Sequence, residues 1–173
     1  MESEGAAAYP LSWLLAAVTV AAALPTTLAP DLLRGPPAMN GSARGTALVM
    51  LVAAVPVLVA AMLAARRGSA RALMLWLGAI AYLGYNGVML LIGTPFNPLF
   101  LLYDAELGLS IWAAIALLYR IDVEALGARF TPGLRVRWIA VFLWVVVVLN
   151  ALVWFRGIVP GMVAEGTDRK SVV

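Results

Sequence analysis

Long apolar stretches separated by short polar gaps that carry arginine make up most of this chain. Five stretches stand out, and each approaches the ~20 residues that a helix needs to cross the hydrocarbon core of a bilayer at ~1.5 Å per residue. They lie near residues 11–29, 46–65, 72–92, 99–119 and 138–155. The pattern predicts an all-α fold: a polytopic transmembrane helical bundle with five spanning helices, forming a single transmembrane domain over residues 1–173.

Composition favours a membrane protein over a soluble one. Of 173 residues, 64% are hydrophobic and 12% are charged, whereas soluble domains are typically about 25% charged. The mean hydropathy is +0.96. A chain of this length cannot bury five such stretches in a water-soluble core, and lipid removes that requirement. The lipid bilayer is therefore the expected partner, together with either a second copy of the chain or an unknown membrane protein.

The chain contains no cysteine and no histidine. This excludes thiol chemistry, thiolate or imidazole metal sites, histidine-ligated haem and nucleophile–histidine pairs. The lone lysine, Lys170, lies in a polar tail, which disfavours a serine–lysine dyad. We therefore expect no enzyme activity, no metal and no cofactor. The pI of about 9.7 comes from scattered arginines without an aromatic platform, so no nucleic acid is expected as a partner.

The distribution of basic residues predicts the orientation in the membrane. The first nine residues carry two glutamates and no lysine or arginine, unlike a secretory signal, so the first stretch is expected to be retained as a helix. A cytoplasmic N-terminus places seven basic residues inside, in the gaps at 66–71 and 120–137, and five outside. Because short cytoplasmic loops are enriched in Lys and Arg, we predict a cytoplasmic N-terminus and an external turn at Gly93–Pro98.

Proline, glycine and asparagine mark the expected ends and bends of the helices. We expect a loop over Asp31–Gly45 and a bend at Pro56, where the missing N–H interrupts the second stretch. Asn97 followed by Pro98 is suited to the N-cap and first turn of the fourth helix.

The last six residues, Asp168–Val173, include the only lysine of the chain. They match what a widely used sequencing-adapter oligonucleotide encodes when it is read in frame. We interpret residues 168–173 as a non-native tail on a C-terminally truncated chain, and expect the natural protein to continue past Glu165 with another helix. A natural polar tail is the alternative interpretation.

Several short motifs between residues 31 and 118 resemble an uncharacterised family of small polytopic bacterial integral membrane proteins. The most specific is the Phe-Asn-Pro-Leu-Phe-Leu-Leu-Tyr block at Phe96–Tyr103. The others are Asp31–Arg34, Ala65–Ser69, Trp76–Gly78, Tyr82–Tyr85 and Leu109–Ser110. The resemblance implies a helical fold in the bacterial cytoplasmic (inner) membrane, assigns no activity, and implies a further Asn-Pro-containing loop and helix beyond the present end. Asp104 and Glu106 stand where the family pattern has apolar residues, so a role for them would be particular to this protein.

Asp104 and Glu106 are the only acidic residues inside an apolar stretch. They lie about 9 and 12 Å beyond Pro98 and, at ~100° per residue, on opposite faces of their helix. We expect Asn86 or Tyr85, at a similar depth on the preceding antiparallel helix, to contact Asp104. Glu106 is expected on another surface, directed toward Arg44 or Arg156. The four candidate binding residues are Asp104, Glu106, Asn86 and Tyr85.

Two interpretations of the acidic pair stay open. Both carboxylates can simply interact with the dipole of the helix N-terminus near the headgroups. Alternatively, an acid at membrane depth handles an ion or a proton. The corresponding functions are an uncharacterised, non-catalytic structural or accessory membrane protein and, as the alternative, a small transporter or channel that uses Asp104 and Glu106. A membrane enzyme is a third and weaker hypothesis, because nothing is arranged like a nucleophile or metal site.

Overall fold

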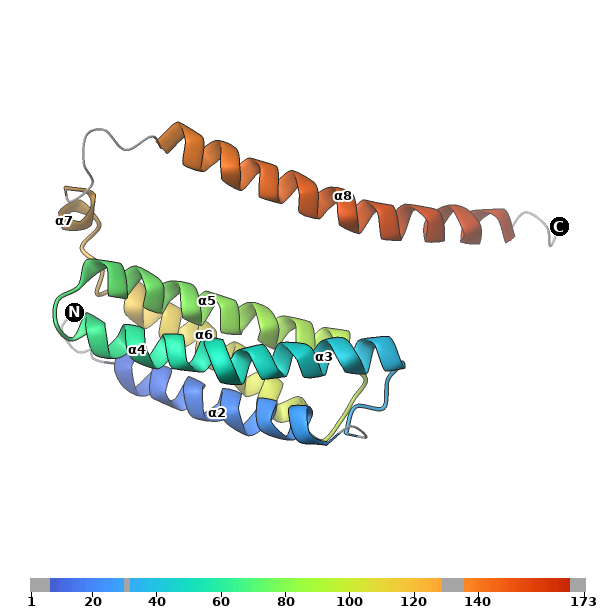
Figure 1. Ribbon diagram of the computed structural model, residues 1–173, viewed down its shortest axis with the longest axis horizontal. Coiled ribbons are helices and arrows are strands. Elements are labelled where there is room, and N and C mark those ends of the chain that lie inside the picture. The colour runs from blue at the N-terminus through green and yellow to red at the C-terminus, as the bar shows by residue number, and fades with distance from the viewer. Residues whose placement is uncertain (1–6, 30–31, 129–135, 169–173) are drawn as a thin grey trace. The chain divides into compact units, whose positions relative to one another are not determined.

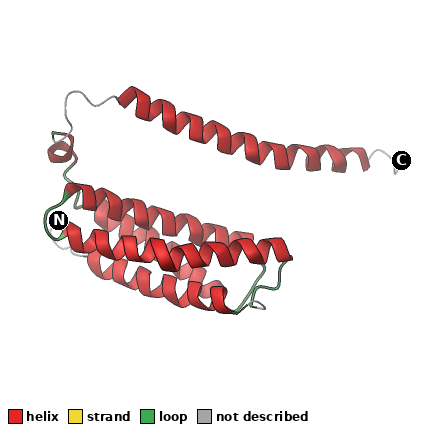
Figure 2. Cartoon of the chain, in the orientation of Figure 1, coloured by secondary structure: helices red, strands yellow, loops and turns green. Residues whose placement is uncertain are grey.

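The computed structural model describes residues 7–29, 32–128 and 136–168. In these parts of the chain, all regular secondary structure is helical (Figure 2). The elements are α2 (Ala8–Leu28), α3 (Pro37–Val49), the π-helix η1 (Met50–Ala54), α4 (Val55–Ala65), α5 (Ala70–Gly93), α6 (Phe100–Leu118), α7 (Val123–Gly127) and α8 (Val136–Asp168). The all-α prediction is therefore confirmed.

Four helices of the described chain are long and apolar enough to cross a membrane. They are Ala8–Leu28, Pro37–Ala65, Ala70–Gly93 and Phe100–Leu118, with lengths of 21, 29, 24 and 19 residues. The second of them comprises α3, η1 and α4 as one continuous helix (Figure 1). The fifth predicted span falls in α8, whose apolar part, Arg137–Val153, is shorter. A fifth crossing therefore stays a prediction, as does the cytoplasmic N-terminus.

The chain divides into two compact units, Met1–Gly127 and Ala128–Val173. In the first unit, the four long helices lie side by side as a bundle with short connections at its two ends (Figure 1). The most extensive packing joins α6 to α5 and to α2, and α5 to α4. In the second unit, α8 is one continuous helix, and its large apolar side chains between Trp138 and Val153 are exposed. That the two units form a single transmembrane domain stays a prediction.

The second span begins well before the predicted residue 46, because most of the expected Asp31–Gly45 loop is helical. Pro37 occupies the first turn of α3, where its fixed φ suits a helix and its missing N–H costs nothing. The Asn40 amide donates to the carbonyls of Leu33 and Gly35, at 2.7 and 3.0 Å, and so ties the remaining short loop to the helix. Weak helix formers in this segment are thus outweighed by packing of α3 on α2.

Pro56 has a local consequence that differs from a simple kink. The turn before it, η1, is π-helical, and the Val55 N–H bonds to the Met50 carbonyl five residues back. A proline in a helix interior removes one backbone hydrogen bond and clashes with the carbonyl four residues earlier. Widening that turn to i→i+5 bonding accommodates the ring and keeps the helix continuous, as single π-turns do in other helices.

Two glycines bring α5 and α6 into close contact. A Cβ atom at Gly87 would lie 3.2 Å from the Leu107 backbone nitrogen and 3.3 Å from its Cα. A Cβ at Gly84 would lie 3.0 Å from the Cβ of Ser110. Small residues at helix interfaces allow such backbone approach, which drives association in lipid where no hydrophobic force acts between helices.

We expect Gly87→Ala to destabilise the bundle, because the new methyl group meets backbone atoms of α6 that cannot move independently. Overpacking of this kind costs about 1–3 kcal/mol. Gly78→Ala is the matched control on the same helix, since no atom lies within 4 Å of a Cβ placed there. Unfolding in detergent would measure both variants. Equal stability of the two would show that α5 and α6 are not in this close register.

Of the predicted non-native tail, residues 168–173, only Asp168 is described, as the last residue of α8. The remainder of that prediction lies outside the described residues. The expected further helix past Glu165 is likewise not tested by a chain that ends at residue 173.

Candidate functional site

A row of three hydroxyl groups follows one face of α2. Ser12, Thr19 and Thr26 are seven residues apart, and all three are buried. Two turns of an α-helix are close to seven residues, so these side chains share one face at intervals of about 10 Å along the axis. The other buried residues on this face are mostly alanines. The hydroxyl row therefore runs along nearly the whole length of the span.

Each hydroxyl bonds to a side chain on another helix. The indole nitrogen of Trp76 on α5 donates to Ser12 Oγ at 2.9 Å. Thr19 Oγ1 donates to Glu106 Oε1 on α6 at 3.1 Å. Thr26 Oγ1 and the Tyr103 hydroxyl on α6 are 3.1 Å apart. Because burying a polar group without a hydrogen-bond partner costs free energy, these pairs favour this packing of α2 against α5 and α6.

Glu106 lies at the middle level of this row and is completely buried. Its Oε1 accepts the hydrogen bond from Thr19, which is near the midpoint of α2. Its other carboxyl oxygen, Oε2, is buried and has no hydrogen-bond partner in the described part of the chain. The nearby Ser110 hydroxyl donates instead to the backbone carbonyl of Glu106, at 2.7 Å. Within the described residues, the site is thus a buried carboxyl group with one hydrogen-bonded oxygen and one oxygen without a partner.

No hydrogen bond joins Asp104 to Asn86 or Tyr85 among the described residues, so a binding role for this predicted grouping stays a prediction. Asp104 is on the exposed face of α6, and Tyr85 is also exposed. Asn86 is buried but donates to the carbonyl of Tyr82, four residues earlier on its own helix, at 2.8 Å. None of the three therefore contributes to the buried site around Glu106.

The expected position of Glu106 on a surface facing Arg44 or Arg156 is wrong. Its side chain points into the bundle, and Arg44, one of its expected partners, donates to the Thr27 carbonyl at 3.1 and 3.3 Å. The inference that Asp104 and Glu106 occupy different faces of the helix was sound. The choice of which one faces the interior was not.

Five residues of the site were not predicted, although the sequence carries a signal for them. They are Ser12, Thr19, Thr26, Trp76 and Tyr103. The heptad spacing of the α2 hydroxyls marks one polar face on an otherwise apolar helix. On α6, Tyr103, Glu106 and Ser110 lie three and four residues apart and so share a face too. Matching two such faces identifies the α2–α6 contact.

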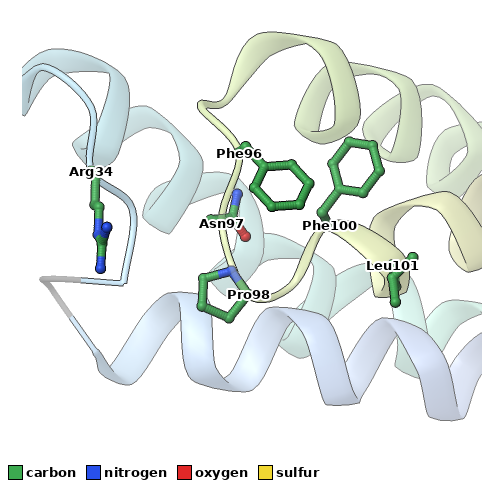
Figure 3. A pocket seen from close by; sticks show the side chains of 6 residues that line it. All are labelled: Arg34, Phe96, Asn97, Pro98, Phe100 and Leu101. Atoms are coloured by element: carbon green, nitrogen blue, oxygen red, sulfur yellow. The ribbon is translucent and has the colours of Figure 1, made fainter.

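A second feature is a cavity of about 340 Å³ at the end of the bundle where α5 connects to α6 (Figure 3). Figure 3 shows Arg34 on one side of it and the Phe96–Pro98 segment on the other. The lining residues are Arg34, Phe96, Asn97, Pro98, Phe100 and Leu101. None of the four predicted binding residues lines this cavity.

Asn97 shapes that connection without capping α6 in the predicted way. The helix begins at Phe100, and its N-cap residue, Leu99, makes no side-chain cap. Asn97 Oδ1 accepts from the Leu99 N–H at 2.9 Å, and its amide donates to the Pro95 carbonyl at 2.9 Å. The asparagine, three residues before the start of the helix, thus closes the turn.

The chemistry of the site is limited to what these side chains can do. Among the described residues, no group of three or more Asp, Glu, His or Cys side chains could hold a metal ion. No protein-family model, curated protein or solved structure matches this chain. The resemblance of residues 31–118 to bacterial membrane proteins therefore stays a prediction. What the geometry offers is hydrogen bonding between helices and one carboxyl group that can carry or release a proton.

A double-mutant cycle on Thr19→Val and Glu106→Leu tests the central contact. Interhelical hydrogen bonds in membranes are worth about 0.6 kcal/mol on average and up to about 1.7, so we expect a coupling energy in that range. Thr19→Val combined with Tyr103→Phe is the control, because these two residues do not bond to each other. A coupling of zero for the first pair, measured by unfolding in detergent, would contradict the contact.

Proposed function

We propose that this protein is a non-catalytic, multi-pass integral membrane protein of the bacterial cytoplasmic membrane, with a structural or accessory role. The observation that supports it best is the hydroxyl row of α2, which is matched along the span by partners on α5 and α6. Side chains that bond to one another in this way fix helix positions, as expected of a scaffold. They leave few polar groups free to act on a substrate.

The second unit is consistent with such a role. Along Arg137–Val153, α8 is mostly apolar and its large apolar side chains are exposed. Lipid or another membrane-embedded helix suits that surface. Asn150, whose amide donates to the Val146 carbonyl of its own helix at 3.1 Å, is a polar group of the kind that joins membrane helices. A second copy of the chain or an unknown membrane protein is the proposed partner.

A small transporter or channel is the second candidate, and one observation favours it. Glu106 is buried near the middle of the bundle and Oε2 has no partner. Intramembrane acids that lack a structural explanation commonly serve proton relays and ion pathways. In this candidate Glu106 takes the functional role, whereas Asp104 sits on the exposed surface of α6.

Flux measurements in liposomes separate the two candidates. We expect wild-type protein, Glu106→Gln and Asp104→Asn to pass protons, Na⁺ and K⁺ no faster than empty liposomes do. Both substitutions remove a carboxylate isosterically, so the exposed Asp104 serves as the matched control for the buried Glu106. Wild-type flux that falls at least roughly tenfold in Glu106→Gln but persists in Asp104→Asn would overturn the accessory role and establish transport.

Single cysteines test the proposed orientation cleanly, because the chain has none of its own. Phe96→Cys and Glu124→Cys both introduce a thiol at an exposed position, at opposite ends of α6. With a cytoplasmic N-terminus, a membrane-impermeant maleimide labels Cys at 96 on intact cells and at 124 only after lysis. The reverse pattern would place the N-terminus outside.

A further inference from the structure

Two arginines from distant parts of the chain converge on one aromatic ring. Tyr9 lies in the first turn of α2, Arg66 directly follows α4, and Arg120 follows α6. The guanidinium carbons of Arg66 and Arg120 are 4.8 and 5.0 Å from the centroid of the Tyr9 ring. Cation–π attraction explains each contact separately, but it also brings two positive charges to the same place.

The ring that gathers these arginines is held in position by its own contacts. The Tyr9 hydroxyl donates to the Met62 carbonyl at 3.4 Å, on the last turn of α4. The centroid of the Trp76 ring lies 4.6 Å from the centroid of the Tyr9 ring. Trp76 is itself held by the hydrogen bond that its indole nitrogen donates to Ser12. The ring against which both guanidinium groups pack is thus held in place by contacts within the bundle.

The two charges are left without a counterion in the described chain. Their distances to the common centroid place the guanidinium carbons less than about 10 Å apart. Both side chains are exposed, and neither forms an ion pair or donates a hydrogen bond within the described residues. Like charges at this separation repel each other. An anion bound beside these groups would reduce the repulsion and accept hydrogen bonds from their N–H donors.

The position of the pair indicates which anion fits. Arg66 and Arg120 each follow the end of an apolar helix, and Tyr9 is near the beginning of another. If these helices span the membrane as proposed, all three residues lie where hydrocarbon gives way to headgroups. Guanidinium groups bind phosphate oxygens through paired hydrogen bonds. With the proposed cytoplasmic N-terminus, this end of the bundle faces the leaflet whose anionic lipids attract basic residues.

We propose that Arg66 and Arg120, held by Tyr9, form a binding site for the phosphate of an anionic phospholipid headgroup. The acyl chains of that lipid would lie along the exposed apolar surface of the bundle below. The site is separate from Glu106 and does not depend on which candidate function is correct.

Native mass spectrometry of the full chain with phosphatidylglycerol or phosphatidylcholine tests the proposal. We expect wild-type protein to retain phosphatidylglycerol preferentially. Arg66→Gln and Arg120→Gln are each expected to weaken that binding about fivefold, the typical effect of one basic residue near an anionic lipid. Arg67→Gln is the matched control, because it removes the same charge from the adjacent exposed position but has no contact with Tyr9.

Three results would overturn the site. Equal losses in Arg67→Gln and Arg66→Gln would show a diffuse surface charge, and equal retention of both lipids would show no headgroup preference. Displacement of phosphatidylglycerol by inorganic phosphate, at constant ionic strength, would show a site for free phosphate. Tyr9→Phe keeps the ring and is expected to keep lipid binding, whereas Arg66→Lys keeps the charge but loses the paired geometry and is expected to bind with intermediate affinity.

Discussion

In the hydrocarbon interior of a bilayer, a polar side chain has no water to bond with and must find a partner inside the protein. The four long apolar helices of the first unit are consistent with such an environment, and a row of hydroxyl groups on α2 meets the constraint. Ser12, Thr19 and Thr26 each reach a side chain on another helix. Apolar faces alone cannot determine packing in lipid, because lipid tails are as apolar as leucine. These bonds, with the close approach at Gly84 and Gly87, therefore select one arrangement of helices from many.

The existence of the helices could be predicted from hydropathy, whereas the residues at which they begin and end were harder to predict. Residues 72–92 and 99–119 were predicted close to the observed α5 and α6. The start of the second span was missed because Pro37 and Asn40 begin a helix that local propensity disfavours. The π-turn before Pro56 was also not predicted, since a kink and a widened turn are both solutions to the same missing hydrogen bond.

The sequence narrows the candidate site to two acidic residues of α6, Asp104 and Glu106, but it does not show which of them is buried. Helical geometry correctly placed Asp104 and Glu106 on different faces, yet nothing within α6 alone distinguishes the exposed acid from the buried one. That choice depends on α2, whose Thr19 supplies the partner for Glu106. Asn86 was predicted to contact Asp104 because the two residues were expected at a similar depth in the membrane. An asparagine can also donate its amide to a carbonyl of its own helix, as Asn86 does here. A pairing between helices therefore requires both faces to be known.

Within the described residues, Glu106 has a carboxyl oxygen without a hydrogen-bond partner inside the bundle. At the end of the bundle, Arg66 and Arg120 carry two positive charges beside the Tyr9 ring without an ion-pair partner among the residues that the structure describes. The position of Glu106 depends on the buried contact between α2 and α6, and cross-linking tests that contact most directly. In the otherwise cysteine-free chain, Thr19→Cys with Glu106→Cys should be joined by a short bifunctional thiol reagent, as read by peptide mass spectrometry. Thr19→Cys with Asp104→Cys should not be joined. Cross-linking of the 19–104 pair without the 19–106 pair would show that Asp104, and not Glu106, faces the interior of the bundle.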